Sequence, residues 1–172
     1  MKRDINMTIE EQKLVLLEAD IQKLEVVLEN YNIKEIDNSG NNILHYYIKQ
    51  SKSLNLNYKS VIDLFVKAGL DIDEKQQKGA YQRSPLHLAV FMKLKDITDY
   101  LIGLGADVNS TDANGNTVLF TAVMSYRGDD GYFIEKLIQS GADIHKTNAH
   151  GISPVELAES IANYDARKYF ER

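Results

Sequence analysis

The sequence predicts an all-α solenoid of about five stacked helix-turn-helix units joined by short β-hairpin-like fingers. Two recurring elements and the apolar helices around them predict this class. A Gly-x-Asp-aliphatic segment recurs at residues 69–72, 105–108 and 141–144, with successive copies starting 36 residues apart. A second element recurs at residues 42–45, 84–87, 117–120 and 153–156. Repetition of this length is typical of arrays in which each unit buries its apolar face only against its neighbours.

The second recurring element marks four helix starts. It begins with Asn42, Ser84, Thr117 or Ser153, whose side-chain oxygen can accept a hydrogen bond from the unsatisfied amides of a first helical turn. A proline follows two of these residues, at positions 85 and 154, where the missing N–H is no loss. Each unit should therefore begin its first helix at this point.

A second helix follows in each unit, with apolar residues at positions i, i+1, i+4 and i+5. These faces lie at residues 61, 62, 65 and 66, at 133, 134, 137 and 138, and, with one threonine, at 97, 98, 101 and 102. The glycine of the Gly-x-Asp segment comes next and suits the left-handed conformation that ends a helix. Each unit thus consists of helix, turn, helix, glycine stop and an extended finger that leads to the next unit.

These residues resemble the ankyrin repeat, with SPLHLAV (84–90) and GADVNSTDANGNTVL (105–119) as close matches over a resemblance that runs from Asp37 to about Phe170. The resemblance implies one ankyrin-repeat domain over residues 1–172. We expect a degenerate N-terminal capping unit at 8–36, repeats at 37–73, 74–110 and 111–145, and a truncated C-terminal capping unit at 146–172.

Both capping units have recognisable residues of their own. Thr8 and Glu11 predict a capping box, with Leu14 and Leu17 as the apolar residues of the first helix. At the other end, the apolar residues at 166, 169 and 170 are expected on a short second helix. More polar outer faces on terminal units keep such a stack in solution.

Composition limits the function classes. The 172 residues include no cysteine, which excludes disulfides, thiolate catalysis and cysteine-ligated zinc. A formal net charge of -5 opposes binding to nucleic acid or an anionic membrane and favours a basic or neutral partner. Six lysines between residues 49 and 78 form a local basic bias that is typical of a solvated surface. With no apolar segment long enough for a membrane helix and no secretion signal at the start, we expect a cytoplasmic location.

The resemblance implies that a partner is held by finger tips and by the concave side of each first helix. It places Tyr81, Arg83, Phe91, Met92, Asn114, Asn116 and Met124 at such positions. The fold does not need apolar groups at the last positions of these helices, so we expect a contact patch there. The alternative is that these side chains pack against an adjacent unit or the long finger.

Extra residues, relative to the repeat length, lie near 51–56, 75–81 and 126–130, and insertions in repeat arrays often lie on the binding side. The third insertion is rich in residue types found in binding hot spots, so it is a second candidate contact, and its alternative is a solvated turn. Its candidate residues are Tyr126, Arg127, Asp129, Asp130 and Tyr132.

The sequence offers little for catalysis. The resemblance implies that His45 and His87 bridge neighbouring fingers, and His145 and His150 have no metalloprotease spacing. The acidic pair at 129–130 lacks the ligand alternation of an EF-hand, so we expect no metal and no cofactor.

The sequence therefore predicts a non-enzymatic protein-binding module that is a monomer when alone. One candidate role is a bacterial immunity protein that neutralises a basic toxin or nuclease domain. The alternatives are a regulatory adaptor, a host-directed ankyrin effector and an enzyme with a site around His145, His150, Asp129 and Asp130.

Overall fold

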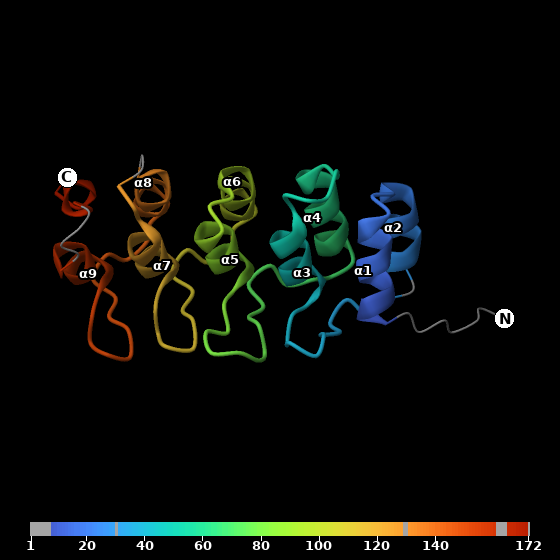
Figure 1. Cartoon of the computed structure of the whole chain (residues 1–172), viewed down its shortest axis with the longest axis horizontal. Helices are drawn as coiled ribbons and strands as arrows, with labels where there is room; N and C mark the ends of the chain where they lie inside the picture. The colour runs from blue at the N-terminus through green and yellow to red at the C-terminus, as the bar shows by residue number, and fades with distance from the viewer. Residues whose placement is uncertain (1–7, 30, 129–130, 161–164, 172) are drawn as a thin grey trace.

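The computed structural model describes residues 8–29, 31–128, 131–160 and 165–171. Within these ranges it contains α-helices and one 3-10 helix but no strand, and the pairs stand side by side in a row (Figure 1). The helices are α1 Ile9–Leu17, α2 Ile21–Leu28, α3 Ile43–Gln50, α4 Tyr58–Lys67, α5 Pro85–Phe91, α6 Lys95–Gly103, α7 Val118–Ser125, α8 Tyr132–Gln139, α9 Pro154–Ser160 and the 3-10 helix η1 Arg167–Tyr169. The predicted all-α solenoid is confirmed.

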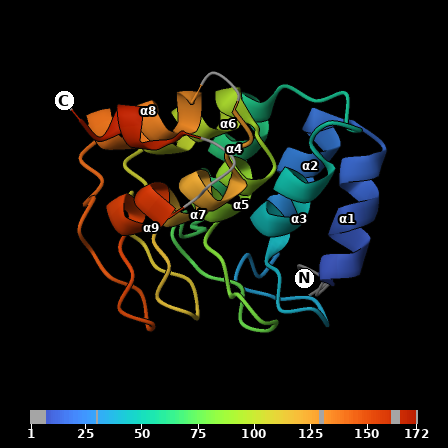
Figure 2. The same ribbon diagram turned by 60° about the vertical axis from the view of Figure 1, so that its left-hand side comes forward.

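The helices form two rows. An inner row of α3, α5, α7 and α9 lies next to the fingers, and an outer row of α4, α6 and α8 lies on the far side of it (Figure 2). Contacts run from α1 to α3, α5, α7 and α9 in turn, and from α2 to α4 and α6. We number the pairs as units one to five from the N-terminus.

The predicted helix starts are present. Oδ1 of Asn42 accepts a hydrogen bond from the amide of His45 at 3.0 Å, and Oγ1 of Thr117 accepts one from Phe120 at 3.0 Å. Ser84 and Ser153 cap α5 and α9 in the same way, with longer bonds of 3.4 Å. Removal of such a cap costs about 1 kcal/mol.

The predicted glycine stops are also present. Gly69, Gly105 and Gly141 have φ of +92°, +92° and +88°, the left-handed conformation that a side chain disfavours. The amide after each glycine donates to the carbonyl five residues earlier in the preceding helix, at 3.0 Å in all three units. The three repeats therefore end in the same hydrogen-bonded turn.

The two capping units differ in part from the sequence expectation. The Thr8–Glu11 capping box is present, but Leu14 and Leu17 are 60% and 55% exposed. The buried side of α1 instead carries Val15 and Leu16, because packing on α2 and α3 selects that side.

At the C-terminus, the predicted short helix is the 3-10 helix η1, with Ala166 fully buried beside it. It contacts α9, which also packs on α7, and so continues the row of units. Among the described residues, no helix has the length and apolar composition needed to cross a membrane.

Candidate protein-binding surface

Two buried histidines tie the inner helices to the fingers. The Asn42 amide donates to Nδ1 of His45 at 3.2 Å, so the other ring nitrogen, Nε2, carries the hydrogen and donates to the Arg83 carbonyl at 3.1 Å. His87 bridges Ser84 and the Asn116 carbonyl, at 2.8 and 3.1 Å. Burial lowers the pKa of both imidazoles to about 4, so both are neutral at neutral pH. Each histidine thereby fixes the finger of the next unit.

Most finger tips are closed by one polar side chain. Oδ1 of Asp112 accepts the amides of Asn114 and Asn116 at 2.8 and 3.0 Å. Asp37 and Asn148 do the same in units two and five. Within the described residues, β-type pairing of the finger backbone is limited to an isolated bridge between Thr111 and Thr117. These asparagine and aspartate turns explain how short fingers hold their shape with little strand pairing.

The finger of unit three, which carries the insertion at 75–81, is held differently. We call residues 75–83 the long finger. The amide and Oε1 of Gln76 bond the backbone carbonyl and amide of Arg83, at 3.0 and 3.2 Å. The long finger also reaches both neighbouring fingers, since the Gln77 amide donates to Gly40 at 2.8 Å and the Tyr81 carbonyl accepts from Ala113 at 2.6 Å.

A groove of about 460 Å³ lies between this long finger and the inner helices α3 and α5. We call it the finger groove. Its walls come from the fingers of units two and three, from Lys49 of α3, and from three residues in or just after α5. The lining residues are Ser39, Lys49, Gln76, Lys78, Gly79, Ala80, Tyr81, Gln82, Arg83, Leu88, Phe91 and Met92.

Four of the residues selected from the sequence meet in this groove: Tyr81, Arg83, Phe91 and Met92. The two aromatic rings are about half exposed, at 46% and 47%. Arg83 is only 7% exposed, because its guanidinium carbon lies 4.4 Å from the Tyr81 ring centre and 4.1 Å from that of Phe91. Arg83 thus supports the two rings as well as lining the groove.

The other selected residues of the inner side lie outside the finger groove. Asn116 is buried, donates to Asp112 at 3.1 Å and accepts from Asn148 at 2.8 Å, so it links two fingers. Asn114 and Met124 are partly buried in unit four. The structure therefore separates a contiguous patch in units two and three from scattered positions in unit four.

The insertion between α7 and α8 packs against its own chain. Tyr126 is buried, and its ring meets that of Tyr169 edge-on with 5.7 Å between ring centres. Arg127 is exposed and turns back to the carbonyls of Met124 and Tyr126, at 2.9 and 2.7 Å. Asp129 and Asp130 lie outside the described residues.

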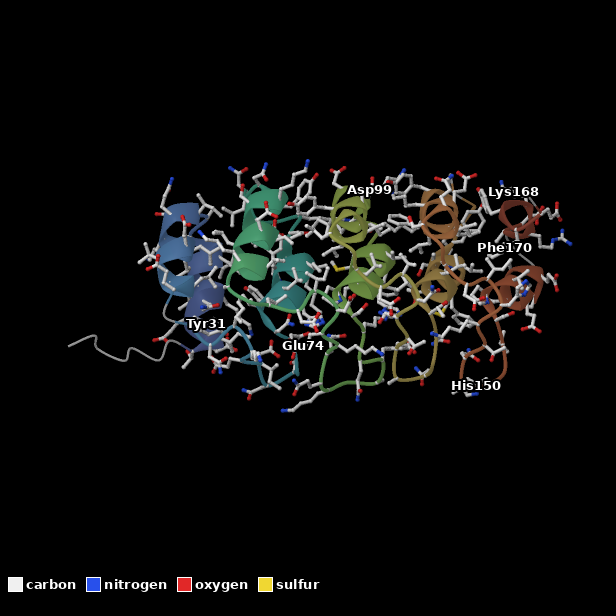
Figure 3. All side chains as sticks on the ribbon, turned by 180° about the vertical axis from the view of Figure 1, so that it is seen from behind. Tyr31, Glu74, Asp99, His150, Lys168 and Phe170 are labelled. Atoms are coloured by element: carbon white, nitrogen blue, oxygen red, sulfur yellow. The ribbon has the colours of Figure 1, made fainter. Side chains whose placement is uncertain are left out.

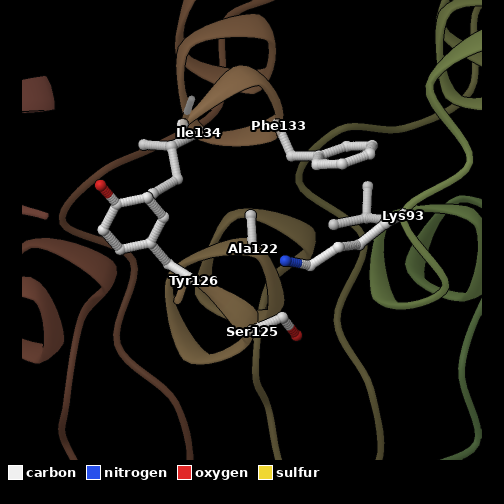
Figure 4. A pocket seen from close by; sticks show the side chains of 8 residues that line it. Lys93, Ala122, Ser125, Tyr126, Phe133 and Ile134 are labelled. Atoms are coloured by element: carbon white, nitrogen blue, oxygen red, sulfur yellow. The ribbon is translucent and has the colours of Figure 1, made fainter. Parts of the chain in front are cut away.

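Tyr132, the last candidate of this insertion, is partly buried at the start of α8. Its hydroxyl donates to Asp99 at 2.5 Å, and the Lys95 ammonium lies 4.5 Å from its ring centre. A cavity lined by Tyr126 and Phe133, together with Lys93 from unit three, measures about 10 Å³, the space of about one water molecule (Figure 4). These tyrosines therefore join units to one another.

The residues of the enzyme alternative do not converge where they are described. His145 and His150 are exposed on the finger of unit five, and their amides donate to Asp143 and Asn148. Figure 3 places His150 at the tip of that finger, away from the outer helices. No cluster of three or more histidine and carboxylate side chains among the described residues has metal-binding geometry.

The chain is a helical repeat protein. Its helix pairs stack in a row, and the glycine stops, histidine bridges and fingers recur from unit to unit, so side chains are presented along one face. Consistent with this class, the family model for ankyrin repeats in three copies matches residues 16–112 and 51–148. The chain belongs to the ankyrin repeat family, whose repeats are protein–protein interaction modules.

Several animal proteins are similar to the chain. It is 33% identical over 137 residues to "Intracellular phospholipase A2" of Caenorhabditis elegans, which is 76% of this chain and 12% of that protein. It is 28% identical over 123 residues to human "Rabankyrin-5", covering 65% of this chain and 10% of the relative. It is 28% identical over 150 residues to the "Nuclear factor NF-kappa-B p105 subunit" of Gallus gallus, covering 81% of this chain and 14% of that protein. The chain thus spans about a tenth of the length of these relatives, and the phospholipase match is confined to ankyrin repeats.

Sequence reasoning missed the role of two lysines. The sequence pattern groups Lys49 and Lys78 with the scattered surface lysines, although the resemblance also puts Lys49 on the concave side of unit two, and both line the finger groove. Lys49 occupies the last turn of α3. Lys78 lies in the insertion of unit three, and its backbone amide lies close to Gly40. The insertion at 75–81 was the signal that could have brought them together.

Proposed function

We propose that the chain is a non-enzymatic protein-binding module that holds a segment of a partner protein in the finger groove. The observation that carries this proposal is the pair of half-exposed aromatic rings, Tyr81 and Phe91, which line the finger groove and flank the Arg83 guanidinium. Aromatic side chains supply large contact area at low entropic cost and are enriched in binding hot spots.

Preorganisation supports the same proposal. Histidine bridges, the Gln76 pairing and the ties to neighbouring fingers hold the long finger before any partner arrives. A surface that is already ordered loses less conformational entropy on binding, which improves affinity.

Two biological roles fit such a module. The net charge of -5 supports neutralisation of a basic bacterial toxin or nuclease domain. The finger groove itself is lined by cationic side chains, which favours a partner segment there that is not basic. The relatives, in which the matched region is a small part of a longer animal protein, support an adaptor role. We propose the adaptor role for this chain.

An affinity purification from the source cells tests the proposal with three forms of the protein: wild type, Phe91→Ser and Val26→Ser. Val26 is an exposed apolar residue of α2 in unit one and serves as a matched control. We expect a stoichiometric partner protein that is retained by Val26→Ser and reduced about tenfold or more by Phe91→Ser. Equal capture by both variants would contradict binding in the finger groove.

The roles are then separated by what is captured. An adaptor should hold two different proteins at once, as seen by mass spectrometry of the native complex. A single basic protein whose toxicity is cancelled by co-expression of this chain would establish the immunity role instead.

A further inference from the structure

The charge of the finger groove opposes that of the whole chain. Its lining includes three cationic side chains, Lys49, Lys78 and Arg83, and no carboxylate. The chain as a whole carries a net charge of -5. The chain has more acidic than basic residues, so a surface of average composition would be slightly acidic. The cationic lining of the groove therefore departs from the average.

Arg83 has unused hydrogen-bonding capacity. Its Nε is enclosed and has no hydrogen-bond partner among the described residues. Its side chain forms no ion pair within that part of the chain either. Contact with an aromatic ring uses the face of a guanidinium and leaves its N–H donors, which lie in the plane, for a carboxylate. The enclosed Nε without a partner is costly, and a carboxylate that approaches from the groove would meet the terminal Nη donors of the same guanidinium.

Two carboxylates of the chain act on these cations, and both are already engaged. Asp112, whose charge acts on Arg83, accepts three hydrogen bonds from Asn114 and Asn116. Asp37, whose charge acts on Lys49, pairs with Lys13 at 2.9 Å. These two carboxylates are therefore occupied, and a partner protein can supply the carboxylate that pairs with the groove cations.

The two lysines are positioned beside the same space. Nζ of Lys49 donates to Asn41 at 2.8 Å, and Nζ of Lys78 donates to the Asn38 carbonyl at 3.4 Å. An ammonium group has three donors, so one such bond fixes the side chain and leaves two donors for a ligand. The lining also includes the apolar side chains of Leu88, Phe91 and Met92.

We propose that the finger groove is a carboxylate-binding site that takes an acidic segment of the partner protein, with an Asp or Glu side chain at Arg83 and Lys49 and a neighbouring apolar side chain on Phe91 and Met92. Lys78 contributes from the long finger. This inference rests on the proposed function, since it names the chemistry of the partner segment. The net charge of -5 disfavours a long polyanion such as a nucleic acid, whose repulsion would act over the whole surface.

Binding of short synthetic peptides to the full chain tests the inference directly. One set places Glu or Asp beside Leu or Phe, a matched set carries Gln or Asn in place of the acid, and a third carries Lys. We expect the acidic set to bind about tenfold or more tightly than the amide set. In NMR spectra, the acidic peptides should shift the Nε–H signal of Arg83 and the amide signals of Gly79 and Ala80.

Charge reversals supply the matched controls. Lys49→Glu and Lys78→Glu should each weaken the acidic peptides about tenfold, whereas Lys67→Glu, on the outer helix α4, changes net charge equally and should leave affinity unchanged. Arg83→Lys keeps the charge and removes the planar set of donors, so it should also weaken binding. If Arg83→Lys does not fold, the lysine variants and the wild-type Nε–H signal decide.

Several outcomes would overturn the inference: equal affinity for acidic and amide peptides, a preference for the Lys set or for an oligonucleotide, or equal losses from Lys49→Glu and Lys67→Glu. Failure of the inference is distinct from failure of the proposed function. If capture of a partner depends on Phe91 but is unchanged by charge reversal at Lys49 and Lys78, the proposed function holds and binding of an acidic segment is excluded.

Discussion

Two loops of the chain that contain insertions each carry a tyrosine and an arginine, and the exposure of these two side chains is reversed between them. In the long finger, the tyrosine (Tyr81) is half exposed and the arginine (Arg83) is buried. In the turn between α7 and α8, the tyrosine (Tyr126) is buried and the arginine (Arg127) is exposed. The difference is set by what covers each insertion: the long finger borders the groove, whereas the turn is covered by Tyr169 from the C-terminal end. Residue type alone therefore does not identify a binding loop.

Acidification should have the largest effect, because it attacks the anchor of the long finger. Burial lowers the pKa of His45 and His87 from 6.5 to about 4. Between these values the folded state binds fewer protons than the unfolded state, so the free energy of unfolding should fall as the pH falls from about 6.5 to about 4, by on the order of 3 kcal/mol for each histidine. Urea unfolding at a series of pH values measures this loss.

The matched control for acidification is the double variant His145→Gln, His150→Gln, which removes two exposed histidines. It should keep the full pH dependence. A stability that does not change between pH 6.5 and 4 would show that the buried imidazoles are protonated in the folded state. Asp37, whose pKa is lowered to about 2 mainly through Lys13 and Asn41 against the effect of burial, adds a further loss only below about pH 4.

Truncation of the two tyrosines tests the comparison itself. Tyr126→Ala removes a buried ring that packs on Tyr169 and should lower the free energy of unfolding by about 3 kcal/mol. Tyr81→Ala removes a half-exposed ring and should cost less than about 1 kcal/mol while weakening partner binding. Thermal unfolding and the peptide titration measure the two effects. The reverse order of stability losses would contradict the contrast between the insertions.

A glycine exchange tests the close approach that positions the long finger. A Cβ on Gly40, where φ is +78°, would lie 2.4 Å from the amide nitrogen of Lys78, so Gly40→Ala must displace the backbone and should cost about 2 kcal/mol. Gly79→Ala has a similar φ of +95° but open space around the Cβ, and should cost about 1 kcal/mol. Chemical denaturation compares the two, and equal losses would mean that the approach at Gly40 is not required.

Arg127→Ala should have the smallest effect. Arg127 is exposed and bonds only carbonyls of its own turn among the described residues, so its loss should change the free energy of unfolding by less than about 0.5 kcal/mol. Its peptide affinity should equal that of wild type. A loss of partner binding in Arg127→Ala would restore the turn between α7 and α8 as a contact surface.

The sequence predicted what depends on local chemistry. Capping residues such as Ser84 and stops such as Gly105 act within one turn of a helix, so their patterns carry the information in full. The exposed positions Tyr81 and Phe91 followed from the family resemblance, which assigns partner contact to finger tips and to the concave side of each first helix. The family resemblance supplied the bridging roles of His45 and His87.

The sequence could not predict contacts between distant residues. Tyr126 is covered by Tyr169, 43 residues later, and no local pattern marks that pairing. The packing side of α1 was offset from Leu14 and Leu17 because two other helices select it. Lys49 and Lys78 meet in the finger groove only because an insertion in one unit turns toward the helix of another.

Placement of the groove in units two and three has a consequence for cooperativity. In a linear array, the helix pair at each end has a neighbour on one side only, so unfolding begins at the ends and proceeds inward. The finger groove has a helix pair on either side of it, α1 and α2 toward the N-terminus and α7 and α8 toward the C-terminus (Figure 1). Helical amide hydrogens of α3 and α5, which border the groove, should therefore exchange with solvent more slowly than those of the terminal pairs, and partner recognition survives when the ends of the array open.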